Sequence, residues 1–182
     1  NLCEYVAMEE AKRAGDLAAA VRHVTRMMEI QTAMGKITPF MGWHPYPCCG
    51  TEWEKKRMEG AAAKLNGPEG ELVALLPEKA AFRADPFDDG RYERWQEPSA
   101  DLASWKSVMS TYGWDTQNLP GMMDEKGHPY RGLAWYQFDV NVPENAKGKQ
   151  VFLHGLAVVN EAWVWVNGRY VGHRPYIGVW FR

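Results

Sequence analysis

The sequence predicts an α+β protein, with an N-terminal helical segment over residues 1–77 and an antiparallel β-sandwich over residues 78–182. Two observations support this division. Before residue 78, apolar residues recur at the three- and four-residue spacing of a helix. After it, short alternating runs are separated by turn signals, of which Asn167-Gly168 is the strongest. A length of 182 residues suits one ordinary domain or two small units.

Composition and charge exclude several classes of protein. Hydrophobic residues make up 46% and charged residues 24%, which is typical of a globular chain. A net charge of −2 without a basic stripe argues against nucleic-acid binding. No run of about 20 apolar residues predicts a membrane span. Because the chain starts at Asn1 and stops just after the apolar run 177–181, we expect it to be a piece of a larger protein.

The first part of the helical segment carries an apolar face. Gly15-Asp16 interrupts this pattern, and two interpretations remain open: Asp16 caps a new helix, or the glycine is tolerated inside one long helix. Gly35 is expected to end the helical run. The apolar face comprises Ala14, Leu17, Val21, Val24 and Met28.

A further helix is expected after a Pro- and aromatic-rich loop. Thr51 with Glu54 forms a capping-box signature, and Asn66-Gly67 is expected to end the helix. The helical segment is too small to bury a sizeable core, so we expect it to pack on another domain or on the sandwich.

The same loop contains the only close grouping of cysteine and histidine. Cys48 and Cys49 are adjacent and His44 lies just before them. Zinc sites normally use cysteines two to four residues apart and four ligands in total. We therefore predict no metal site here.

Six short strands are expected in the second half. In the longest, Ala134, Tyr136, Phe138, Val140 and Val142 should occupy one face, while Trp135, Gln137, Asp139 and Asn141 should occupy the other. Asn167-Gly168 predicts a type I′ hairpin turn, which needs positive φ at both residues. The expected strands are 79–83, 105–109, 131–142, 149–156, 161–166 and 170–171.

Four stretches of the second half carry a family resemblance. They are 130–136, 140–143, 149–153 and, most clearly, Ala162-Trp-Val-Trp-Val-Asn-Gly-Arg-Tyr-Val-Gly-His173. Together they resemble the sugar-binding domain of family 2 glycoside hydrolases, the β-galactosidase and β-glucuronidase group. The resemblance implies a galactose-binding-like jelly roll over residues 78–182. It also implies that this jelly roll is incomplete, because the strands that normally follow are absent after Arg182.

The same resemblance implies a bacterial protein, secreted or periplasmic, whose catalytic carboxylates lie on a separate (β/α)₈ barrel. No catalytic residue is therefore expected in this chain. Asn160-Glu161 is similar to the acid/base dipeptide of such enzymes, but it opens a strand of the sugar-binding pattern. We interpret it as structural.

Candidate substrate-binding residues cluster around the predicted hairpin. Asn167 either serves the turn alone or, as the resemblance implies, offers its amide to sugar hydroxyls. Arg169 and His173 lie close enough in sequence to line the same rim, but each is more simply explained as a solvated side chain. Trp163 and Trp165 share one strand face, which we expect to pack on another domain, with glycan stacking as the alternative.

The predicted function is that of a non-catalytic sugar-binding or accessory domain, with carbohydrate and the catalytic barrel of the same polypeptide as partners. The alternatives are a stand-alone carbohydrate-binding module and a purely structural interaction domain. No cofactor is expected. Asp85, Asp88 and Asp89 form the one acidic cluster in the sequence that suits calcium, but these residues are more simply explained as turn residues.

Overall fold

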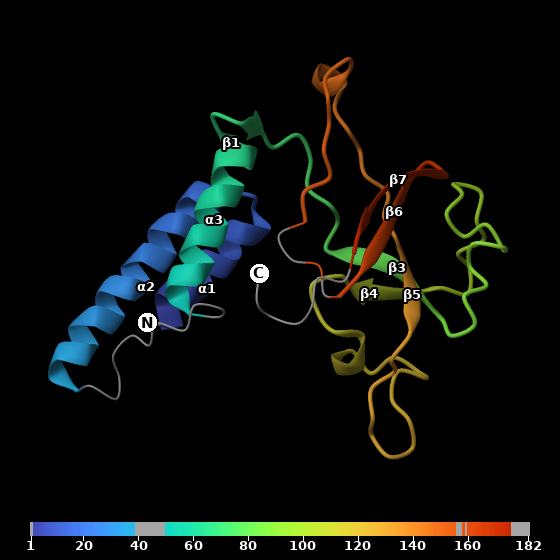
Figure 1. The fold of residues 1–182 in the computed structure, drawn as a ribbon, viewed down its shortest axis with the longest axis horizontal. Coiled ribbons are helices and arrows are strands. Elements are labelled where there is room, and N and C mark those ends of the chain that lie inside the picture. The colour runs from blue at the N-terminus through green and yellow to red at the C-terminus, as the bar shows by residue number, and fades with distance from the viewer. Residues whose placement is uncertain (1, 39–49, 156–157, 159, 176–182) are drawn as a thin grey trace. The chain divides into compact units, whose positions relative to one another are not determined.

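A computed structural model describes residues 2–38, 50–155, 158 and 160–175. The chain divides into two compact units (Figure 1). The first contains the described residues of 1–75 and of Pro143–Asn160, and the second contains Leu76–Val142 and Glu161–Pro175. Helices and antiparallel strands are both present, which confirms the α+β class. No described helix combines the length and apolarity needed to cross a membrane.

The first unit is built on three helices: α1 (Leu2–Arg13), α2 (Leu17–Ile37) and α3 (Thr51–Leu65). The helix is interrupted between α1 and α2, where the Asp16 carboxylate caps the start of α2. It accepts a hydrogen bond from the Ala19 N–H at 2.8 Å. Of the two interpretations of Gly15-Asp16, the one in which Asp16 caps a new helix is confirmed. The buried core of the unit consists of Met8, Leu17, Ala20, Val24, Met58 and Ala61.

Two helix boundaries differ from the sequence prediction. Gly35 does not end α2, which continues to Ile37 and is capped where the Thr38 N–H bonds to the Met34 carbonyl. A single glycine costs a helix only about 1 kcal/mol, which the packing of a long helix offsets. Thr51 does open α3, but the cap is Gly50, so the capping-box prediction was wrong.

The ends of α3 are tied to α2 by side chains. The Thr51 hydroxyl donates to Gln31 Oε1 at 3.0 Å, and Asn66 Oδ1 accepts from the Leu17 N–H at 3.1 Å. α3 ends at Leu65 with Asn66 as its C-cap, as predicted. A small hairpin follows, formed by β1 (Asn66–Gly67) and β2 (Gly70–Glu71).

The second unit contains an antiparallel sheet in the order β4-β3-β5, formed by β3 (Lys79–Asp85), β4 (Lys106–Met109) and β5 (Leu133–Gln137). The strands predicted at 79–83 and 105–109 are confirmed to within two residues. One face of the sheet covers a core of Ala80, Phe82, Val108 and Met122.

The long strand predicted over 131–142 is shorter than expected. Its alternation is confirmed inside β5: Ala134 and Tyr136 pack on the core, whereas Trp135 contacts residues of the opposite face. Val140 and Val142 lie beyond β5 and are 38% and 50% exposed. Pairing between β5 and β3 ends at Gln137, opposite Ala81, although β3 itself extends back to Lys79.

The strand predicted at 149–156 is not formed by its described residues. Residues 149–155 pair with no described strand, and Val151, Phe152 and Leu153 are all more than half exposed. An apolar run becomes a strand only where a neighbour supplies hydrogen bonds and cover. A short turn, η3 (Glu144–Ala146), precedes this segment.

The last hairpin matches the sequence prediction closely. β6 (Ala162–Val166) and β7 (Arg169–Arg174) pair antiparallel around Asn167, at φ 50°, and Gly168, at φ 78°. Both turn residues have positive φ, as a type I′ turn requires. The described strands form sheets of two, three and two strands, so the jelly-roll topology stays a prediction.

Candidate functional site

A bulge in the β6–β7 hairpin sets which side chains share a surface. Pairing shifts between Val164↔Gly172 and Trp165↔Tyr170, which leaves Val171 without an opposite residue. His173 and Tyr170 are three positions apart and would otherwise lie on opposite faces. The bulge lets His173 pair with Trp163 and Tyr170 pair with Trp165 on the same face.

Trp163 and His173 form the outer part of this face. Their rings stack with centroids 4.9 Å apart and an interplanar angle of 7°. His173 Nε2 lies 2.7 Å from Glu161 Oε1, so the Glu161 side chain is engaged across the hairpin. Trp163 keeps 39% of its surface exposed. The structure thus brings two of the predicted site residues, Trp163 and His173, into one polar-edged aromatic surface.

Trp165 has a different environment, although it shares the strand face. Its ring lies 5.1 Å from that of Trp135 on β5, so it attaches the hairpin to the three-stranded sheet. Trp135 in turn contacts Trp95, which contacts Trp105. The indole Nε1 of Trp105 is buried and has no hydrogen-bond partner among the described residues. Trp165 therefore belongs to an interior aromatic cluster.

Asn167 and Arg169 lie exposed at the hairpin tip. A Cβ built on Gly168 would lie 3.7 Å from side-chain carbons of both Glu97 and Pro98. The turn therefore lies beside the segment that contains these two residues. Arg94 Nη2 bonds to Glu97 Oε1 at 2.8 Å. Sequence reasoning missed Glu97 as a neighbour of the turn, because 70 residues separate them and no local pattern links them.

Asp85 has an anchoring role that the sequence only partly suggested. Its carboxylate is 2% exposed and accepts hydrogen bonds from the N–H groups of Asp89 at 2.8 Å and Gly90 at 3.0 Å, and from Trp135 Nε1 at 2.8 Å. Both oxygens are thus used by N–H donors, which supports the turn interpretation over a calcium ligand. The guanidinium of Arg83 lies 4.1 Å above the Trp95 ring nearby.

Metal-ligating side chains do not gather elsewhere in the described residues. No group of three or more His, Cys, Asp or Glu there is arranged to hold an ion. His44, Cys48 and Cys49 lie outside the residues that the structure describes.

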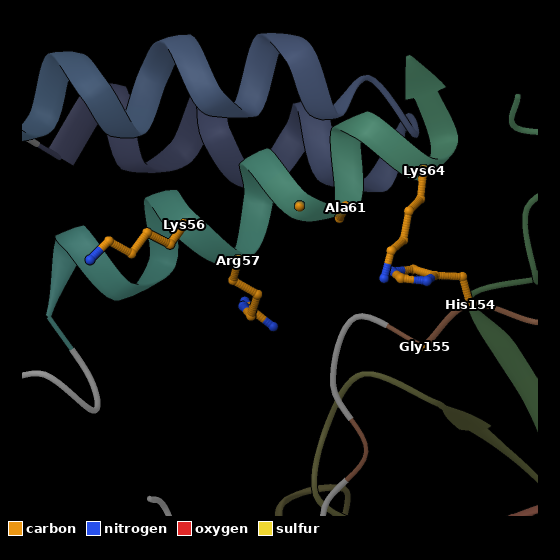
Figure 2. Close-up of a pocket in the computed structure, with 7 residues that line it drawn as sticks. Lys56, Arg57, Ala61, Lys64, His154 and Gly155 are labelled. Atoms are coloured by element: carbon orange, nitrogen blue, oxygen red, sulfur yellow. The ribbon is translucent and has the colours of Figure 1, made fainter. Parts of the chain in front are cut away.

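A pocket of about 240 Å³ lies along α3 in the first unit (Figure 2). Sequence reasoning did not identify it, because its two walls come from segments about 90 residues apart. It is lined by Lys56, Arg57, Gly60, Ala61, Lys64, His154 and Gly155.

Comparison with known proteins gives one partial similarity. No family model and no solved structure matches the chain. A β-galactosidase of Thermoanaerobacter pseudethanolicus (strain ATCC 33223 / 39E) is 43% identical over 47 residues, which are 26% of this chain and 6% of that enzyme. The match thus spans only a small fraction of the length of this curated relative. It supports a relationship between this chain and a glycoside hydrolase.

Proposed function

We propose that the chain is a non-catalytic accessory unit of a bacterial glycoside hydrolase of the family 2 type, and that β3 to β7 belong to its jelly-roll sandwich. The catalytic carboxylates would lie on a separate barrel of the same polypeptide. The partial match to a β-galactosidase and the β6–β7 hairpin support this proposal.

The observation that carries the proposal is the geometry of the hairpin tip. Asn167 lies exposed in a turn that fixes its backbone, so its side-chain amide is presented on a rigid support. An amide both donates and accepts hydrogen bonds, which suits sugar hydroxyls. Trp163 and His173 extend this surface along the hairpin, and such an aromatic patch suits a neighbouring catalytic domain.

A second candidate function, a stand-alone carbohydrate-binding module, is favoured by the exposure of Trp163. An exposed indole with the His173 ring stacked on it, and Glu161 hydrogen-bonded to that ring, resembles a stacking platform with polar groups beside it. The two candidates differ in one respect: a binding module holds sugar by itself, whereas an accessory unit acts together with its catalytic domain.

The test uses the 182-residue chain in two assays. In the first, an aryl β-galactoside is offered as substrate, and we expect no hydrolysis; turnover by the chain alone would overturn the proposal. In the second, galactose and lactose are titrated while the indole N–H of Trp163 and the side-chain amide of Asn167 are followed by NMR. Unchanged resonances support the accessory unit, and saturable shifts of both favour the binding module.

A further inference from the structure

Among the described residues, the pocket along α3 is lined by basic side chains and small residues, without a carboxylate (Figure 2). Lys56, Arg57 and Lys64 come from α3, and His154 comes from the segment after η3. Both segments belong to the same compact unit. Lys149 of that segment also forms an ion pair with Glu71 at 2.7 Å. This arrangement favours a negatively charged occupant.

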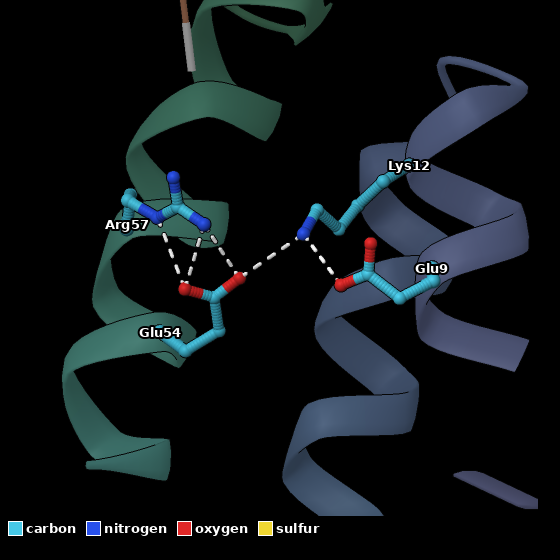
Figure 3. A network of polar contacts seen from close by, with 4 residues as sticks. All are labelled: Glu9, Lys12, Glu54 and Arg57. Atoms are coloured by element: carbon cyan, nitrogen blue, oxygen red, sulfur yellow. Dashed lines mark hydrogen bonds and ion pairs between the residues drawn. The ribbon is translucent and has the colours of Figure 1, made fainter. Parts of the chain in front are cut away.

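Two of the basic groups are already neutralised by neighbours. Lys56 pairs with Glu52 at 3.1 Å, and Arg57 pairs with Glu54 at 2.7 Å. Glu54 Oε1 also accepts a hydrogen bond from Lys12 Nζ of α1, at a distance of 3.4 Å (Figure 3). Arg57 is therefore held in place by a network that links α1 to α3.

Lys64 and His154 make up the unneutralised part of the pocket. Neither forms an ion pair with a described residue. Both side chains line the pocket, and in Figure 2 that of Lys64 extends from α3 toward His154. An ammonium group and an imidazole that line the same pocket, with no carboxylate among the described lining residues, offer several N–H donors to one acceptor group.

Two small residues of α3, Gly60 and Ala61, also line the pocket. Gly60 lies inside α3, where glycine weakens a helix relative to alanine. A Cβ built on Gly60 would meet nothing within 4 Å, so packing against a neighbour does not require the glycine there. The volume of about 240 Å³ is below the roughly 300–1,000 Å³ of pockets for drug-sized ligands. A small ligand fits this size.

We propose that this pocket binds one small oxyanion, with Lys64 and His154 as the principal donors and Arg57 as a neighbouring side chain that Glu54 holds in place. The shared chemistry is an anionic group with several acceptor oxygens. Its two possible sources are free phosphate and the carboxylate of an acidic sugar. The site is separate from the hairpin and does not depend on the proposed function.

The test is an NMR titration of the 182-residue chain at constant ionic strength, because salt screens exposed charges. Inorganic phosphate and galacturonate are the probes, and galactose is the neutral control. We expect saturable shifts of the Gly60 and Gly155 amides with an acidic probe and none with galactose. The amides of Gly168 and Gly172 report on the hairpin, so the two proposals fail independently.

Three variants test whether the acidic probe binds in the pocket. Lys64→Gln should weaken binding by about tenfold, because it removes a charged donor. Lys55→Gln on the same helix removes an equal charge outside the pocket lining, and binding should stay within about twofold. Gly60→Glu adds a carboxylate at an open position and should abolish binding while helical content is retained.

The outcomes separate the two sources. Saturation by phosphate alone identifies free phosphate as the ligand, and tighter binding of galacturonate identifies an acidic sugar. No saturable shift with either probe would overturn the proposal. Equal losses in Lys64→Gln and Lys55→Gln would also overturn it, since binding would then follow overall charge.

Discussion

Trp163 and His173 stack face to face across the β6–β7 hairpin, with ring centroids 4.9 Å apart and planes inclined by 7°. The pair depends on the bulge at Val171, because without it His173 would project from the other face of β7. Aromatic pairs of this kind contribute about 0.5–1.5 kcal/mol beyond area burial. The stack thus orders a surface whose outer member, Trp163, stays 39% exposed.

The two tryptophans of β6 should respond differently to truncation. Trp165→Ala removes the contact with Trp135 and should cost about 3 kcal/mol of unfolding free energy, because it opens a void in the aromatic cluster. Trp163→Ala should cost about 1 kcal/mol, because the ring is partly exposed. Urea denaturation of both variants measures this difference. Equal losses would contradict the division into an outer and an inner ring.

Asp85→Ala should be strongly destabilising. The change leaves three N–H donors, on Asp89, Gly90 and Trp135, without their acceptor in a buried position. A loss of about 3 kcal/mol is expected, since bonds to a charged acceptor contribute about 1.5–3 kcal/mol each and are not additive. The exposed Asp139→Ala is the matched control and should change stability by less than about 0.5 kcal/mol. A small effect at Asp85 would show that the turn holds without the carboxylate.

Two Gly→Ala changes should have opposite signs. Gly168 has φ 78°, so Gly168→Ala should destabilise the hairpin by about 1–2 kcal/mol. Gly60 lies within α3 with open space around its Cα, so Gly60→Ala should stabilise the chain by about 1 kcal/mol. Thermal unfolding of the two variants tests both signs. Stabilisation by Gly168→Ala would contradict the type I′ turn.

The turn at Asp124 should show acid sensitivity. The backbone N–H of His128 and then its side chain hold the pKa of Asp124 below its usual 3.8. Because the folded pKa is depressed, the ionised carboxylate stabilises the turn above pH 3.8, and this stabilisation is lost as the pH falls through the folded pKa. An NMR titration of the carboxyl group measures it. A pKa at or above 3.8 would contradict the assigned hydrogen bonds.

The features predicted correctly from sequence are those set by neighbouring residues. Asn167-Gly168 defines its own turn through positive φ, and the termination of α3 before Gly67 follows from local chemistry. The alternation inside β5 follows from the period of a strand. In each case the physical cause lies within a few residues of its effect.

The features that the sequence did not reveal depend on distant partners. The hydrogen bond from Trp135 to Asp85 joins residues 50 positions apart. The pocket wall at His154 faces α3 from a segment that was expected to be a strand. That expectation failed because an apolar run does not specify its own strand partner. Thr51 matched a capping signature, but its hydroxyl donates to Gln31 of another helix.

The most direct test of the central proposal is the activity of the glycoside hydrolase in which we propose this chain to be an accessory unit, with Asn167→Gly as the variant. Glycine keeps the positive φ of the turn and removes the side chain with its amide, so the hairpin should still fold. If the hairpin offers Asn167 to the substrate, kcat/KM for an aryl β-galactoside should fall about tenfold, as expected for the loss of one hydrogen bond. An unchanged kcat/KM in a stably folded variant would contradict the proposal that the tip of this accessory unit contacts carbohydrate.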